Sequence, residues 1–459
     1  MMRIIQFLFC SLFIVSASGQ TISKQLETAI KNLEADDQMK NATLGFFVVD
    51  QKTSSVIFNK NGQTGMVPAS SQKIITAATI LEMLGNDFRF QTDLSYDGKI
   101  EKGILNGNIY LMGYGDPTLG SERYDSASVN YLFNLWISQI KQAGIQQING
   151  HVICFDKIWE SQTLPGGWIW DDIGNYYGAG SSAINWRENS YDILLKSGKN
   201  ERDSTRIVSI LPTLKEVVLI NEIVTGKPLS GDNAWIYLPP YCAHGFLRGT
   251  IPPRQNSFKI SGSFPNPTLQ LQNELTDEII RNGITLDNNT TTTENTGVPI
   301  LNNLISHYSA SMENMVYWFL RKSINLYGEA FVKTIGFRKK NRGATTVGIE
   351  VIKDFWKTKG IEQSAMNMGD GSGLSPLNRI TPEVLVNVMQ YAKSRPWYSS
   401  FYKALPEFNG IKMKSGTMTG VKSFTGYING FTFAIIINNY SGLSSEITKK
   451  IYKVLDVMK

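Results

Sequence analysis

The chain has 459 residues, 42% of them hydrophobic and 11% aromatic, so it is long enough for two or three domains and too apolar to be disordered. Its 45 basic and 39 acidic residues give a net charge of +6, and the basic residues are dispersed along the chain. This pattern argues against a nucleic-acid-binding protein and suits either solubility or attraction to an anionic polymer.

The N-terminus has the features of an export signal. Arg3 precedes an apolar run over residues 4–15, and the small residues Ala17 and Gly19 have the spacing of a signal-peptidase site. The run is too short to span a bilayer. We therefore expect a signal peptide over residues 1–19, a periplasmic protein, and no integral membrane segment after cleavage.

The cysteines and histidines give no sign of a metal or cofactor. Cys154 and Cys242 remain after signal cleavage, and they could either pair or stay as separate thiols. His151, His244 and His307 are scattered, with no metal-binding spacing. We expect neither a metal nor a cofactor.

The first predicted elements are a hairpin and a buried helix. Apolar runs over residues 44–49 and 55–59 flank a polar turn, which is typical of a β-hairpin. The stretch VPASSQKIITAATILEML, residues 67–84, predicts a helix that ends at Gly85. This helix leaves no polar face wide enough for water, so we expect it to be buried.

The middle of the chain is rich in strands and turns, first over residues 88–186 and then, with few helix signals, over residues 187–265. Helical periodicity returns near residue 268 and persists to residue 392. Three strand-like runs follow, and the last two join at Asn429-Gly430, a strong hairpin signal.

A final helix over residues 447–458 carries one apolar face. A membrane-surface helix would show such a face, but we favour packing against a sheet. The hairpin near the N-terminus and the three C-terminal strands then predict one five-stranded antiparallel sheet with helices on both faces. This is an α/β fold with the middle of the chain inserted.

A Ser-x-x-Lys pattern stands at the start of the buried helix, at Ser70 and Lys73. The pattern occurs three times in the chain, and the copies at Ser138 and Ser400 lack a helix start in the right place. At a helix N-terminus, backbone N–H groups are free to stabilise an oxyanion. Lys73 would be buried, where an ammonium is costly unless it has a partner.

Two further motifs complete a possible active site. Ser323-Ile-Asn325 lies between helical segments, and Lys414-Ser-Gly, followed by Thr417, lies on the first of the three C-terminal strands. Ser-x-x-Lys, Ser-x-Asn and Lys-[Ser/Thr]-Gly in this order form the signature of penicillin-binding proteins and β-lactamases.

Acyl transfer through a serine explains why serine, lysine and asparagine stand in these three motifs. Ser70 is a poor nucleophile until a base takes its proton, and Lys73 can do so if the nearby charge of Lys414 keeps it neutral. Ser323 can relay a proton to the leaving amine, and Asn325 can orient the substrate amide.

The strand that carries Lys414, Ser415, Gly416 and Thr417 can bind an extended peptide along its edge. Lys414 and Thr417 would hold a C-terminal carboxylate. The backbone N–H groups of Ser70 and of Thr417 or a near neighbour would form the oxyanion hole.

On these motifs the chain resembles the class C low-molecular-mass penicillin-binding proteins, the D-alanyl-D-alanine carboxypeptidase/endopeptidase family. The resemblance covers nearly the whole mature chain. Besides the three motifs, it rests on the blocks GYGDPTL (113–119), GWIWDDIGNYYGAGSSAINWREN (167–189), SINLYGE (323–329), DGSGLSPLNRITP (370–382) and KSGTMTGV (414–421).

The resemblance implies a penicillin-binding-protein/β-lactamase-like transpeptidase domain with two inserted β-rich domains. The expected parts are the signal peptide 1–19, the catalytic domain 20–90 and 297–459, inserted domain II 91–186 and 266–296, and inserted domain III 187–265. Ser415 stands where the family usually has threonine, and Pro376 stands where some members have an arginine. Asp172 is expected to approach the amino group of the cross-linking residue, or else to form part of a turn between domains.

The resemblance also implies the function. We expect a serine carboxypeptidase and endopeptidase that cleaves D-Ala-D-Ala ends and cross-links of peptidoglycan peptides through an acyl-enzyme on Ser70. We expect β-lactams to inhibit it. The alternatives are a related acyl-transfer enzyme, either a transpeptidase or a β-lactamase, and a catalytically silent wall-binding protein.

Overall fold

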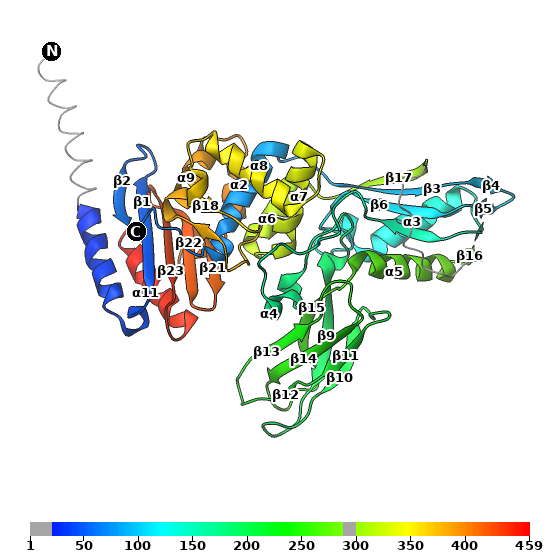
Figure 1. Cartoon of the computed structure of the whole chain (residues 1–459), viewed down its shortest axis with the longest axis horizontal. Helices are drawn as coiled ribbons and strands as arrows, with labels where there is room; N and C mark the ends of the chain where they lie inside the picture. Colours follow the sequence, from blue (N-terminus) through cyan, green and yellow to red (C-terminus); the bar gives the residue numbers. More distant parts are fainter. Residues whose placement is uncertain (1–20, 288–299) are drawn as a thin grey trace, which may run out of the picture. The chain divides into compact units, whose positions relative to one another are not determined.

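The computed structural model describes residues 21–287 and 300–459, so the predicted signal peptide lies outside the described residues. The chain divides into two compact units (Figure 1). The first contains the chain up to Asn86, Val316–Ser323 and Ile349–Lys459, and the second contains Asp87–Met315 and Ile324–Gly348.

The first unit is built on one antiparallel sheet made from both ends of the chain. Its strand order is β2-β1-β23-β22-β21-β20. The strands are β1 (Thr43–Asp50), β2 (Val56–Lys60), β20 (Glu407–Phe408), β21 (Ile411–Met418), β22 (Val421–Ile428) and β23 (Phe431–Asn438). The sheet has six strands and not the predicted five, because the two-residue β20 pairs with the start of β21.

Helices cover both faces of this sheet, as predicted. The alternation of side chains along each strand places Phe46 and Ile435 on one face, where they pack with the helix over residues 21–34 and with α11 (Ser444–Asp456). On the other face, α9 (Pro382–Lys393) packs against β1, β22 and β23, and α2 packs against α9. The remaining helices with residues in this unit are α2 (Lys73–Leu84), α10 (Tyr398–Ala404) and parts of α6 (Met312–Arg321) and α8 (Thr345–Lys357).

The second unit contains two groups of sheets with separate cores. In the first group, one sheet has the order β17-β3-β6-β8 and the other β16-β7-β5-β4. Helices α3 and α5 share the core of this group, which includes Trp136 and Leu271. The elements are β3 (Gln91–Tyr96), β4 (Lys99–Glu101), β5 (Ile104–Asn106), β6 (Ile109–Gly113), α3 (Val129–Gln142), β7 (Gln147–Ile148), β8 (Val152–Phe155), α5 (Pro267–Arg281), β16 (Thr285–Leu286) and β17 (Asn302–Tyr308).

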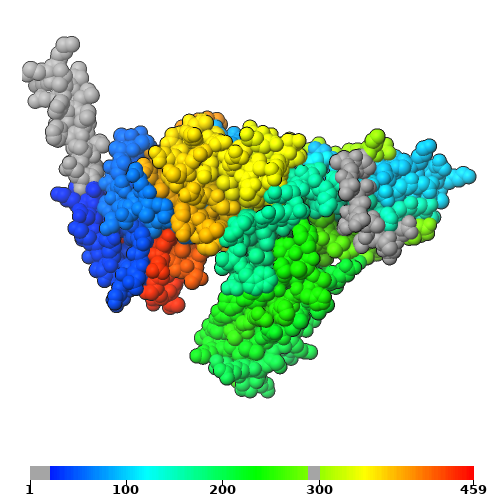
Figure 2. Space-filling view, in the orientation of Figure 1, coloured from blue at the N-terminus to red at the C-terminus, as the bar shows by residue number. Residues whose placement is uncertain are grey.

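The second group forms a β-rich lobe around its own core, which includes Ile193 and Leu247, and it is coloured green in Figure 2. One sheet has the order β10-β9-β15, and in the other β14 pairs with β11, β12 and β13. The strands are β9 (Ser190–Lys196), β10 (Arg206–Leu211), β11 (Val218–Asn221), β12 (Val224–Thr225), β13 (Asn233–Tyr237), β14 (His244–Ile251) and β15 (Phe258–Ser263). The short helix α4 (Trp170–Ile173) contacts β13, and α7 (Asn325–Lys340) also belongs to this unit.

Strand β17 pairs antiparallel with β3. It therefore belongs to the sheet of residues 91–96, although it follows the domain boundary that the sequence places at residue 297. Among the described helices, none combines the length and the hydropathy needed to cross a membrane.

Candidate active site

Ser70 lies on a tight turn that precedes the buried helix. The 3₁₀ turn η2 (Ala69–Gln72) holds the serine, and the α-helix begins only at Lys73. Ala69 has a φ of 46°, a left-handed conformation that is uncommon for alanine. A Cβ atom at Gly373 would lie 2.1 Å from the carbonyl oxygen of Ala69, so only glycine allows this approach.

The side chain of Lys73 reaches Ser70. Its Nζ lies 3.0 Å from Ser70 Oγ and donates to the carbonyl oxygen of Ser372 at 2.7 Å. The Nζ also lies 5.7 Å from the ring centroid of Phe319. Lys73 is 0% exposed, which confirms its predicted burial. A buried amine held against a serine hydroxyl is suited to accept the hydroxyl proton when the amine is neutral.

A second lysine–serine pair lies in the same unit. Lys414 Nζ donates to Ser323 Oγ at 3.1 Å and to the carbonyl oxygen of Ser415 at 2.8 Å. Ser323 lies between α6 and α7 and has a φ of 57°, a strained conformation for serine.

Burial, together with the charges of Lys73 and Lys422, holds the pKa of Lys414 well below its usual range. Repulsion between Lys73 and Lys414 disfavours the state in which both are protonated. A proton on Lys73 therefore makes Lys414 harder to protonate.

The strand β21 passes very close to the Ser70 turn. A Cβ atom at Gly416 would lie 2.5 Å from the carbonyl oxygen of Pro68 and 2.9 Å from the backbone nitrogen of Ser70. On the neighbouring strand, Ser423 Oγ donates to the Pro68 carbonyl at 2.6 Å and lies 2.7 Å from Ser71 Oγ. These contacts fix the backbone of Ser70 against the sheet.

Lys422 is a residue that the sequence reasoning missed. It pairs with Thr417 across β21 and β22, and its Nζ donates to Thr417 Oγ1 at 2.8 Å. Burial lowers its pKa. The sequence predicted strands on both sides of this contact but no turn or register between them, so it did not show that residue 422 lies opposite residue 417.

Asp370 is a second missed residue, and it organises the loop beside the Ser70 turn. Its buried carboxylate accepts hydrogen bonds from Gln72 Nε2 at 3.0 Å, from the backbone N–H of Gly373 at 2.8 Å and from the backbone N–H of Ser375 at 2.6 Å. It thereby ties the turn that carries Ser70 to the loop that carries Ser372. The block DGSGLSPLNRITP contains Asp370, but its pattern gives no role to the individual residues.

The structure brings seven of the predicted site residues together in the first unit. They are Ser70, Lys73, Ser323, Lys414, Ser415, Gly416 and Thr417.

The other two predicted residues, Asn325 and Asp172, belong to the second unit. Asn325 Nδ2 donates to the carbonyl oxygen of Tyr177 at 2.8 Å. Burial and the nearby Asp171 raise the pKa of Asp172, and a hydrogen bond with Tyr177 opposes them. Tyr177 thus contacts both residues.

The two other Ser-x-x-Lys copies lie in different surroundings. Ser138 donates to the carbonyl oxygen of Leu135 within α3. Ser400 lies in the first turns of α10, contrary to the expectation that no helix begins there, and its hydroxyl accepts from Asn86. Over residues 21–287 and 300–459, no three His, Cys, Asp or Glu side chains group as metal ligands, and Cys154 and Cys242 are not paired.

Comparison with known proteins places the chain in a family. The chain is 25% identical over 473 residues to a D-alanyl-D-alanine carboxypeptidase of Actinomadura sp. (strain R39), with 94% of this chain and 84% of that protein covered. It is 22% identical over 427 residues to the D-alanyl-D-alanine carboxypeptidase DacB of Haemophilus influenzae, with 88% and 86% covered.

The crystal structure of penicillin binding protein 4 from Haemophilus influenzae matches the fold with a TM-score of 0.76 at 20% identity, and it covers 93% of this chain and 98% of that one. This match confirms the predicted fold class. The model of the D-Ala-D-Ala carboxypeptidase 3 (S13) family matches residues 26–407. The chain therefore belongs to the D-Ala-D-Ala carboxypeptidase 3 (S13) family and is a serine-type D-Ala-D-Ala carboxypeptidase.

Proposed function

We propose that Ser70 is the nucleophile, and that the enzyme cleaves both D-Ala-D-Ala ends and cross-links of peptidoglycan peptides through an acyl-enzyme. The observation that carries this proposal is the 3.0 Å contact between Ser70 Oγ and the buried Nζ of Lys73. The hydrogen bond between Lys414 and Ser323 supports it, because it supplies a second proton-transfer group in the same unit.

In the proposed acylation step, the neutral amine of Lys73 takes the proton of Ser70 while Oγ attacks the D-Ala carbonyl carbon. The 2.7 Å bond from Lys73 to the Ser372 carbonyl orients the amine so that its lone pair faces the hydroxyl. The carbonyl oxygen becomes an oxyanion, which the backbone N–H groups of Ser70 and Thr417 stabilise.

In the next step the tetrahedral intermediate collapses, and the C–N bond breaks. The proton that Lys73 took from Ser70 passes to the departing amine through Ser323, which contacts Lys414, so that the leaving group departs as a neutral amine and Lys73 is neutral again. Water then attacks the ester carbon and gives a proton to the neutral amine of Lys73. The bond between that carbon and Ser70 Oγ breaks, the peptide leaves with a new carboxyl group, and Lys73 returns the proton to Ser70. Asn325 is proposed to orient the substrate amide, and Asp172 to contact the amino group of the cross-linking residue.

The carboxylate of the leaving residue is proposed to bind at Thr417 and Lys422, near the amine of Lys414. Lys422 already donates to Thr417 Oγ1, so a carboxylate oxygen there would meet a hydroxyl and an ammonium group. Strand β20 pairs only with Ile411 and Lys412 of β21. The edge from Ser415 to Thr417 lies beyond β20, where an extended peptide can add.

The proposal extends to location, inhibition and domain organisation. We infer a signal peptide over residues 1–19, action in the periplasm and acylation by β-lactams, as for the family that the motifs resemble. We also infer that residues 91–186 with 266–296, and residues 187–265, are separate inserted domains. The two separate cores of the second unit support this division.

Digestion of purified muropeptides tests the activity. The mature protein should release D-Ala from pentapeptide monomers and convert cross-linked dimers into monomers, and Ser70→Ala should do neither. Ser138→Ala is the matched control and should keep both activities. Uncut dimers at an enzyme concentration that fully trims monomers would overturn the endopeptidase half of the proposal.

A further inference from the structure

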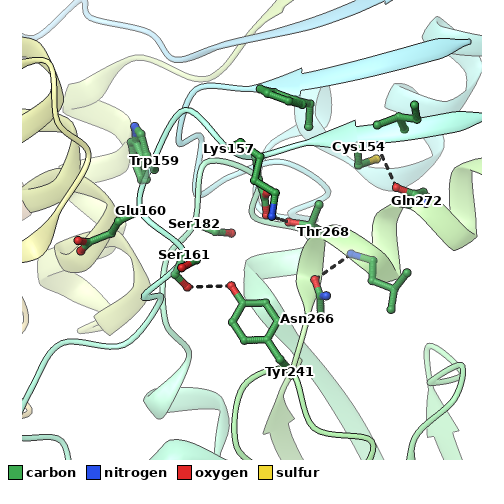
Figure 3. A pocket seen from close by; sticks show the side chains of 14 residues that line it. Cys154, Lys157, Trp159, Glu160, Ser161, Ser182, Tyr241, Asn266, Thr268 and Gln272 are labelled. Atoms are coloured by element: carbon green, nitrogen blue, oxygen red, sulfur yellow. Dashed lines mark hydrogen bonds between the residues drawn. The ribbon is translucent and has the colours of Figure 1, made fainter. Parts of the chain in front are cut away.

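The second unit contains a pocket of about 250 Å³ that the proposed chemistry does not use. It lies between the end of β8, the loop that follows it, and the N-terminal part of α5 (Figure 3). Ile153, Phe155 and Leu269 form its apolar wall. Its volume is just below the usual range for small-molecule sites, which suits one sugar ring or one short side chain.

Gln272, which lines this pocket, carries an unused hydrogen-bond donor. Its Oε1 accepts from the backbone N–H of Cys154 at 3.1 Å, which fixes the orientation of the amide. Its Nε2 has no partner among the described residues, although Gln272 is only 2% exposed. A buried amide donor is normally satisfied, so this one points to an acceptor oxygen that the chain itself does not supply.

Hydroxyl-binding groups stand on the other sides of the pocket. Asp156 accepts from Thr268 Oγ1 at 2.8 Å and retains further acceptor capacity on its carboxylate. Tyr241, whose side chain is largely exposed, donates to the carbonyl oxygen of Ser161 at 2.9 Å. Figure 3 shows Ser161, Tyr241 and Asn266 on one side of the pocket and Gln272 on another.

The charges that line the pocket do not select a strong anion. Lys157 contributes one positive charge, and Asp156 and Glu160 contribute two negative charges. A phosphate or a free carboxylate would gain from Lys157 but would be repelled by the two carboxylates. A neutral ligand that carries both donors and acceptors fits this set better.

We propose that the pocket binds an N-acetylated sugar unit of the peptidoglycan strand. The acetamido carbonyl would accept from Gln272 Nε2, the acetamido methyl would lie against Leu269 and Phe155, and ring hydroxyls would bond to Asp156. This inference rests on the proposed function, because that function makes the enzyme meet glycan-linked peptides. Through this pocket the enzyme would bind the glycan strand in addition to the stem peptide.

Two variants with a matched control test the site. Gln272→Glu keeps the acceptor for the Cys154 N–H but removes the donor, and Leu269→Phe fills the pocket without removing a polar bond. Gln270→Met is the control, because Gln270 lies on the same helix and bonds outside this pocket, to Thr213 and Glu274. The probes are a tetramer of N-acetylglucosamine and a stem peptide without sugar, titrated into the full mature chain by NMR or calorimetry.

The proposal predicts that wild type, Ser70→Ala and Gln270→Met bind the tetramer equally, and that Gln272→Glu and Leu269→Phe bind it at least tenfold more weakly. Absence of tetramer binding in wild type would overturn the proposal. So would binding unaffected by both pocket variants, or stem-peptide binding that these variants abolish.

Penicillin labelling of the same proteins separates this inference from the proposed function. Gln272→Glu and Leu269→Phe should label like wild type. A wild-type protein that binds the tetramer but does not react with penicillin would overturn the acyl-enzyme proposal and leave the sugar site standing.

Discussion

Lys73 Nζ lies 3.0 Å from Ser70 Oγ, and both atoms belong to the segment that turns from η2 into α2. The first prediction concerns this contact. Replacement of Lys73 by alanine should lower the rate of penicillin acylation by at least ~10²-fold, the low end for loss of a general base. Stopped-flow mixing measures the rate, and circular dichroism checks the fold.

The matched control is Lys141→Ala, the lysine of the Ser-x-x-Lys copy in α3, which is exposed. It should acylate at the wild-type rate. Near-normal acylation by Lys73→Ala would show that another group takes the proton of Ser70.

The second prediction concerns the close approach of β21. In Gly416→Ala the new Cβ would lie 2.5 Å from the Pro68 carbonyl and 2.9 Å from the Ser70 nitrogen, so the strand or the turn must shift. Because that nitrogen is the proposed oxyanion donor, acylation should fall by roughly 10²-fold, as for loss of one such donor. Gly166→Ala, where a Cβ would meet nothing within 4 Å, should leave the rate unchanged. An unchanged rate in Gly416→Ala would argue against this oxyanion hole.

The third prediction concerns Lys422. If its ammonium holds the leaving-group carboxylate with Thr417, Lys422→Ala should lower kcat/KM for a D-Ala-D-Ala peptide by about tenfold or more, as for loss of a charge-assisted bond. The loss should be much smaller for the same peptide with an amidated C-terminus. Lys412→Ala, on β21 and beside Glu407, is the control. Equal losses for acid and amide would exclude the carboxylate role.

The fourth prediction concerns the pH dependence of stability. Burial lowers the pKa of Lys333 from its usual 10.5 to about 8. Its Nζ donates to the carbonyl oxygen of Ser181 at 2.9 Å. Between these two pKa values the unfolded chain binds more protons than the folded chain, so this group makes the free energy of unfolding rise with pH across that window.

Lys333→Met should therefore flatten the dependence of the unfolding free energy on pH between about 8 and 10, as urea titrations would show. Lys339→Met, an exposed position on the same helix, should keep the wild-type slope. A slope for Lys333→Met that matches wild type would mean that this lysine titrates normally in the folded chain.

Much of the fold could be predicted because it depends on local pattern. Two apolar runs on either side of a polar turn predicted β1 and β2, the Asn429-Gly430 pair predicted the β22–β23 turn, and the continuous apolar run predicted α2. Each of these signals depends on neighbouring residues alone. The burial of Lys73 also followed from the pattern of its own helix.

The features that the sequence did not show depend on contacts between distant segments. The left-handed backbone at Ala69 and Ser323 is held by surrounding structure and not by their residue types. The pairing of β17 with β3 joins residues about two hundred positions apart, and no local pattern of apolar residues can predict such a pairing. The hydrogen bond between Asp370 and Gln72 of the Ser70 turn also joins segments that are far apart in the sequence.

Mass spectrometry after reaction with penicillin identifies the residue that forms the acyl-enzyme, which we propose to be Ser70. We expect one penicilloyl adduct on the peptide that contains Ser70, its loss in Ser70→Ala, and normal labelling of Ser138→Ala and Ser400→Ala. An adduct on another serine, or an undiminished adduct in Ser70→Ala, would contradict it.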